Sequence, residues 1–87
     1  MDALLLQTPE QLSLHLKALR KARGLTQTQI AARIGIGQSR YAFIEQHPLR
    51  ASTGQILELL AALDVDLLMR PRDSRPKRRA VRAGEDW

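Results

Sequence analysis

The sequence contains no cysteine, and its only aromatic residues are Tyr41, Phe43 and Trp87. The absence of cysteine excludes disulfide bonds and thiolate metal sites. The two histidines, His15 and His47, match no metal-ligand spacing, so we expect no metal or other cofactor. Because aromatic residues are scarce, the core must be built from Leu, Ile, Val and Ala. A chain of 87 residues buries a marginal core, and a partner chain is the expected source of extra stability.

Long apolar runs are also missing. No stretch approaches the roughly 18 apolar residues of a membrane span. The chain begins MDALLLQTPEQ, with an acid at position 2 and a short apolar run, which is not a signal-peptide pattern. We therefore expect a cytoplasmic protein with no membrane partner, associated with the nucleoid when it is bound to DNA. No nucleophile–base pair, phosphate loop or carboxylate cluster occurs, so an enzyme is not expected.

Basic residues exceed acidic ones by 14 to 9, which gives a net charge of +5. This balance favours a polyanion, with nucleic acid as the first candidate and an anionic membrane surface as the second. Residues 71–87, PRDSRPKRRAVRAGEDW, carry +3 of that charge and few apolar groups. Such a segment cannot bury enough surface to offset its ordering entropy, so we expect a disordered basic tail. Residues 1–70 form the single expected folded domain.

Capping signals and apolar spacing predict a first helix that starts at Pro9. Thr8 and Gln11 form a capping box around this start. Gly24 supplies the left-handed residue that ends the helix. The spacing i, i+4, i+7 places one face in the core, formed by Leu12, Leu16, Leu19 and Ala22. The basic residues lie off that face and are Lys17, Arg20, Lys21 and Arg23.

Two shorter helices are predicted next. One follows the cap Thr26 and ends at Gly35, and the other runs from about Gly37 or Gln38 to Gln46. Two short helices joined by a glycine-containing turn are typical of a helix-turn-helix, whose second helix enters the DNA major groove. At its N-terminus, Gln can bond adenine and Arg can bond guanine in bidentate fashion. The candidate DNA contacts are Gln27, Thr28, Arg33, Gly37, Gln38, Ser39, Arg40, Phe43 and Arg50.

The aromatic residues of the third helix allow two interpretations each. Tyr41 is expected to pack in the core, with its hydroxyl as a possible phosphate contact. Phe43 falls on the outer side of this helix. It could touch a thymine methyl or sugar, or pack against another chain.

A fourth helix and one strand complete the expected fold. Ser52 and Gln55 form a capping box for the helix, which Asp64 ends. Val65–Arg70 is predicted to be a strand, with Val65, Leu67 and Met69 on one side. A lone strand needs a partner, and the same strand of a second copy is the best candidate, with Leu4–Leu6 a weaker one. The expected dimerisation residues are Val65, Leu67, Leu68 and Met69.

The sequence GLTQTQIAARIGIGQSRYAFIE, residues 24–45, resembles the Cro/C1-type (Xre family) helix-turn-helix. The resemblance extends over roughly residues 10–66. It implies a mainly α, lambda-repressor-like bundle of four to five helices plus one C-terminal β-strand that pairs across a dimer. Two positions depart from the family pattern: Tyr41 replaces the usual Ile or Val, and Gly37 replaces the usual capping Ser.

Within that family the chain is most similar to HipB-type antitoxins. The similarity includes the Cro-like domain, the strand expected after the fourth helix, the short disordered tail and the final pair Asp86-Trp87. It implies a homodimer that binds a palindromic double-stranded operator, represses its own operon and neutralises a HipA-type Ser/Thr kinase toxin. Trp87 is the candidate anchor for that kinase, although a Trp at this position can also arise by chance. The alternative is a phage-like or general Xre-family repressor without a toxin partner.

Overall fold

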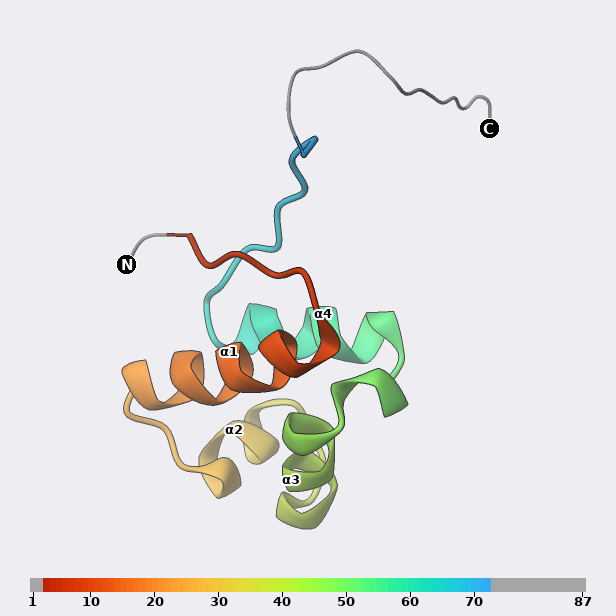
Figure 1. Ribbon diagram of the computed structural model, residues 1–87. Coiled ribbons are helices and arrows are strands. Elements are labelled where there is room, and N and C mark those ends of the chain that lie inside the picture. The colour runs from red at the N-terminus through yellow and green to blue at the C-terminus, as the bar shows by residue number, and fades with distance from the viewer. Residues whose placement is uncertain (1–2, 73–87) are drawn as a thin grey trace.

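The computed structural model describes residues 3–72 and contains four α-helices and one 3-10 helix (Figure 1). These elements are α1 (Pro9–Ala22), α2 (Gln27–Arg33), α3 (Gln38–Gln46), η1 (Pro48–Arg50) and α4 (Thr53–Ala62). The expected mainly helical bundle of four to five helices is confirmed. No helix in this part of the chain is long and apolar enough to cross a membrane.

The helix ends follow local capping chemistry. The predicted capping box of Thr8 and Gln11 is formed at α1, and Thr26 forms a second box with Gln29 at α2. The box expected at α4 is only half formed. Ser52 Oγ accepts a hydrogen bond from the backbone N–H of Gln55 at 3.0 Å, but the Gln55 side chain does not return to the cap. That side chain instead accepts a hydrogen bond from α3, as described below.

The core is aliphatic except for Tyr41, whose side chain is fully buried. Its main members come from all four α-helices and include Leu16, Leu19, Ile30, Ala31, Tyr41, Ile44, Ile56, Leu59, Leu60 and Leu63. The Tyr41 hydroxyl makes no hydrogen bond to another group in the described residues. Burial, reinforced by the negative charge of Glu45, raises the pKa of Tyr41 to about 12 because both disfavour the phenolate.

The segments before α1 and after α4 lie on the side of the bundle away from α2 and α3 (Figure 1). The strand expected over Val65–Arg70 is not formed in the single chain, and no strand occurs in residues 3–72. A strand requires a hydrogen-bonded neighbour, and Leu4–Leu6 does not pair with this segment. The N-terminal segment is instead attached to α1, where His15 Nε2 lies 2.6 Å from the carbonyl oxygen of Leu5.

Arg23 connects the end of α1 to the end of α4. Its Nε donates to the carbonyl of Leu63 at 2.9 Å, and its Nη2 donates to the carbonyl of Asp64 at 3.0 Å. Asp64 adopts a left-handed conformation with φ 61°. The guanidinium therefore binds the carbonyls at the point where the chain leaves α4. Most of the tail predicted over residues 71–87, including Trp87, lies outside the described residues.

Candidate nucleic-acid interface

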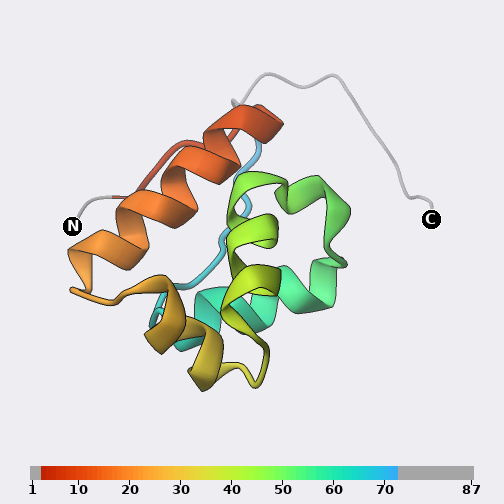
Figure 2. The same ribbon diagram turned by 90° about the horizontal axis from the view of Figure 1, so that it is seen from below.

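The turn between α2 and α3 is formed by Gly35, Ile36 and Gly37. Gly35 has φ +75°, a conformation that other residues adopt only with strain, and it ends α2. The Ile36 N–H then donates to the carbonyl of Ala31 at 3.0 Å, which closes the turn tightly. Gly37 is the N-cap of α3 and provides no side-chain oxygen to its first turn. Figure 2 shows α2 and α3 side by side on the face of the bundle opposite the terminal segments.

The first turn of α3 presents three exposed polar side chains, Gln38, Ser39 and Arg40. Gln38 Nε2 donates to Gln27 Oε1 at 2.8 Å, so this interaction joins the starts of α2 and α3. Thr28, at the start of α2, is also exposed. The predicted residues at the starts of the two short helices are thus brought together by the bond between Gln38 and Gln27.

Arg40 is held by two neighbours. Its Nη2 donates to Gln55 Oε1 at 3.2 Å, and its guanidinium carbon lies 5.9 Å from the centre of the Phe43 ring. The Phe43 ring in turn lies 5.1 Å from the ring of His47. Phe43 is 40% exposed, as expected for the outer side of the helix. These contacts restrict the orientations of Arg40 before any ligand is bound.

Two predicted arginines lie apart from these bonded groups. Arg33 is exposed at the last position of α2, and Arg50 is exposed at the last position of η1. Neither contributes to the contacts of Gln38 or Arg40 described above. Their positions suit long-range attraction to a phosphate backbone, which requires charge and reach but no fixed geometry.

A buried ion pair lies beneath this surface. The expectation that Arg20 lies off the buried face of α1 is wrong: this residue is 8% exposed and Glu45 is 2% exposed. Arg20 Nε donates to the two oxygens of Glu45 at 2.9 and 3.2 Å. Its Nη1 donates to the carbonyl of Leu25 at 2.9 Å. The hydrogen bond to Glu45 raises the pKa of Arg20 above its ordinary value of 12.5.

Sequence reasoning missed this ion pair and the role of Gln55. A signal for Arg20 was available, because it follows the fully buried Leu16 by four residues and therefore shares its side of the helix. Gln55 was assigned to a helix cap, which left its bond to Arg40 undetected. Local sequence gives no indication of which distant residue competes for such a side chain.

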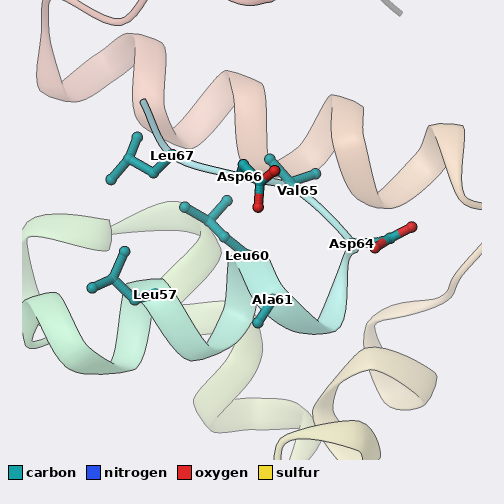
Figure 3. A pocket seen from close by; sticks show the side chains of 7 residues that line it. All are labelled: Leu57, Leu60, Ala61, Asp64, Val65, Asp66 and Leu67. Atoms are coloured by element: carbon teal, nitrogen blue, oxygen red, sulfur yellow. The ribbon is translucent and has the colours of Figure 1, made fainter. Parts of the chain in front are cut away.

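The opposite side of the bundle carries exposed apolar side chains. Leu68 is 82% exposed and Met69 is 94% exposed, whereas Val65 packs against the core. An open groove of about 380 Å³ lies between α4 and the segment that follows it (Figure 3). It is lined by Leu57, Leu60, Ala61, Asp64, Val65, Asp66 and Leu67. The groove contains no cluster of charged groups suited to a metal, nor does the remainder of residues 3–72.

Comparison with known proteins places this geometry among DNA-binding regulators. The helix-turn-helix family model HTH_3 matches residues 16–68, which is more than half of the chain. An uncharacterized HTH-type transcriptional regulator of Sinorhizobium fredii, y4dL, is 28% identical over 72 residues. The match covers 83% of this chain but only 37% of that relative, so the relative is considerably longer.

Solved structures of HipB have the same fold. The structure of a HipB–O1–O2 complex aligns with a TM-score of 0.72 at 25% identity and covers 79% of this chain and 100% of that one. A HipA–HipB–O2–O3 complex aligns with a TM-score of 0.73 at 24% identity, covering 82% and 100%. The bundle therefore resembles a protein that has been solved as a complex with O1 and O2.

Proposed function

The chain belongs to the HTH_3 helix-turn-helix family of DNA-binding transcription regulators, and from this premise we propose that it is a homodimeric autorepressor that binds a palindromic operator. The observation that carries this proposal is the exposed first turn of α3, whose Gln38 and Arg40 are held by Gln27 and Gln55. Side chains held in this way lose less conformational entropy on binding than free ones. In this proposal, α3 lies in the major groove.

The proposed contacts differ in chemical role. Gln38 reads adenine and Arg40 reads guanine, because their hydrogen-bonding groups match those base edges. Phe43 supports Arg40 and offers an apolar edge to a thymine methyl. Phosphate contacts, which position the protein without reading sequence, are proposed for Gln27, Thr28, Arg33, the N–H of Gly37, Ser39 and Arg50.

A dimer accounts for the apolar surface after α4. Exposed apolar side chains that follow one another along a chain are typical of interaction sites. In the proposed dimer, Val65, Leu67, Leu68 and Met69 pair with the same residues of a second copy as two antiparallel strands. Two α3 helices related in this way should lie about 34 Å apart, one turn of DNA.

Footprinting on the protein's own promoter tests the operator proposal. We expect protection of a short inverted repeat, and loss of that protection for Gln38→Ala and Arg40→Ala. Leu14→Ala, an exposed position on α1, is the control and should protect normally. Protection without a symmetric site would contradict the dimeric reader, and binding equal to that of random duplex would contradict sequence-specific regulation.

We further propose that the protein is the antitoxin of a HipA-type Ser/Thr kinase. The support is its similarity to HipB structures and the pair Asp86-Trp87 in the basic tail. A Trp side chain gains much from burial in a partner's pocket. Trp87→Ala should weaken binding to a kinase encoded beside the gene and leave operator binding intact. If no such kinase gene is adjacent, or binding is unchanged, the protein is a general Xre-family repressor.

A further inference from the structure

Three side chains form a continuous series from the surface to the interior, and we name them the amide relay: Gln38, Gln27 and Glu45. Gln38 Nε2 donates to Gln27 Oε1 at 2.8 Å. Gln27 Nε2 donates to Glu45 Oε1 at 3.4 Å. The relay therefore connects the exposed first turn of α3, through α2, to a carboxylate that is only 2% exposed.

The inner end of the relay is chemically fixed. Arg20 donates to both oxygens of Glu45 and is itself bound to the Leu25 carbonyl. Ser13 Oγ donates to the backbone carbonyl of Glu45 at 2.7 Å, which adds a second connection between α1 and α3. A carboxylate paired with a guanidinium stays ionised, and an ionised carboxylate accepts hydrogen bonds but donates none.

This acceptor sets the orientation of both amides. An amide can present either its oxygen or its nitrogen to a neighbour, so a Gln–Gln pair alone has two orientations. Because Glu45 only accepts, Gln27 must turn its Nε2 inward and its Oε1 toward Gln38. Gln38 must then turn its Nε2 toward Gln27. Its Oε1 and its second N–H remain available at the surface.

We propose that Glu45 is a positioning residue that sets the base preference of Gln38, an inference that rests on the proposed function. An acceptor beside a donor complements adenine, which offers the N6 donor and the N7 acceptor in the major groove. Guanine offers two acceptors, N7 and O6, and would instead match an outward NH₂ group. The relay therefore favours adenine over guanine at the base pair that Gln38 contacts.

Glu45→Gln tests the relay because it replaces a carboxylate, which only accepts, with an amide that can also donate. Arg20 Nε contacts both carboxylate oxygens, and Gln27 binds Oε1, the nearer of the two to Arg20. The new amide can therefore offer Gln27 either its oxygen or its nitrogen, so Gln27 and Gln38 are no longer held in one orientation. We expect an adenine-over-guanine preference of about tenfold in the unaltered protein, within the usual range for a bidentate contact. In Glu45→Gln this preference should fall toward one.

The experiment uses the full chain and a pool of randomised DNA duplexes. The enriched sequence of the unaltered protein is compared with that of Gln38→Ala to find the base pair that Gln38 reads. Duplexes with adenine or guanine at that position are then titrated with each variant. Gln27→Met should reduce the preference as well, and adding Glu45→Gln to it should have no further effect. Additive effects of these two changes would overturn the relay.

Loss of stability alone must not explain the result. Leu59→Ala leaves a cavity in the core at a fully buried residue that takes no part in the relay, and it should leave the base preference unchanged. If Glu45→Gln does not fold, Arg20→Met with Glu45→Leu replaces the ion pair with apolar groups, a change that proteins often tolerate. This double variant lacks the acceptor and should also lose the preference.

The possible outcomes distinguish failure of the proposed operator binding from failure of the relay inference. If the unaltered protein enriches no sequence, the proposed operator binding fails and the relay inference fails with it. If it enriches a site that Gln38→Ala relaxes, and neither Glu45→Gln nor the double variant changes the preference at that base pair, only the relay inference is overturned.

Discussion

The two sides of this small bundle differ in how much of their structure a single chain provides. On the side of α2 and α3, Gln38 and Arg40 each bind a partner within the chain, and a buried ion pair lies beneath them. On the other side, Leu68 and Met69 are almost fully exposed and the backbone after Val65 belongs to no ladder. The exposed side chains at the start of α3 thus have partners within the chain, whereas the side chains of Leu68 and Met69 remain exposed in the described residues.

We expect the stability of the side formed by α2 and α3 to depend on the ion pair between Arg20 and Glu45. Arg20→Met leaves a buried carboxylate without its charge partner, so we expect the free energy of unfolding to fall by about 3–5 kcal/mol. Urea denaturation measures this loss. Adding Glu45→Leu should recover most of the stability, because the uncompensated charge is then gone. A loss below about 1 kcal/mol for the single change would show that the pair does not support this surface.

The second prediction concerns the apolar side. Leu68→Glu places a charge where the proposed dimer buries a leucine in each copy. Each burial is worth about 1.5–3 kcal/mol, so the dimer dissociation constant should rise about a hundredfold or more. Sedimentation equilibrium measures that constant. Leu14→Glu, at a 64% exposed position on α1, is the matched control and should leave it unchanged. A Leu68→Glu protein that stays dimeric would place the interface elsewhere.

The third prediction uses the only tyrosine of the chain as a probe of the core behind α3. Tyr41 has a pKa of about 12 when folded, against about 10 when unfolded, so the folded state holds its proton more tightly. Its contribution to stability is therefore complete below pH 10 and is lost as the pH rises from 10 to 12. The expected loss is about 2 kcal/mol.

Near-ultraviolet absorbance reports ionisation of Tyr41 directly, and denaturation at each pH reports stability. Tyr41→Phe should flatten this part of the pH dependence and change stability at neutral pH by less than about 1 kcal/mol, because the hydroxyl makes no hydrogen bond within the described chain. Titration of Tyr41 near pH 10 in the folded protein would contradict its burial.

The smallest expected effect concerns the cap of α3. Gly37 has φ −77° and open space around the position of a Cβ atom, so serine fits there and supplies the missing capping oxygen. Gly37→Ser should raise the free energy of unfolding by about 0.3–0.5 kcal/mol. Gly35→Ser makes the same change at φ +75° and should cost about 1–2 kcal/mol. Thermal denaturation of both variants distinguishes capping from a general effect of serine, and equal shifts would contradict the capping argument.

The helices could be predicted from sequence because their signals are local. Thr8, Thr26 and Gly35 each act within four residues of themselves, and the helix bounds follow from them. The bond between Arg20 and Glu45 joins residues 25 positions apart, and nothing near either residue identifies the other. The same holds for Arg40 and Gln55, 15 positions apart.

The segment Val65–Arg70 shows a different limit of sequence reasoning. Alternation describes which side chains could share a face, but a strand exists only when another segment supplies its hydrogen bonds. Within residues 3–72 none does. Most of the predicted DNA contacts are exposed, Gln27 is half-buried, and their roles toward bases and phosphates stay predictions.

The Arg23 contacts at the end of α4 have a consequence for operator architecture. Arg23 binds the carbonyls of Leu63 and Asp64, so the direction in which the chain departs is fixed relative to α1. In a dimer joined through Val65–Arg70, this junction would fix the distance and orientation between the two α3 helices. One base pair inserted between the half-sites rotates one half-site by roughly a tenth of a turn relative to the other, and a rigid dimer cannot adjust to that rotation. In such a dimer we expect Arg23→Met to widen the range of half-site spacings that the protein tolerates.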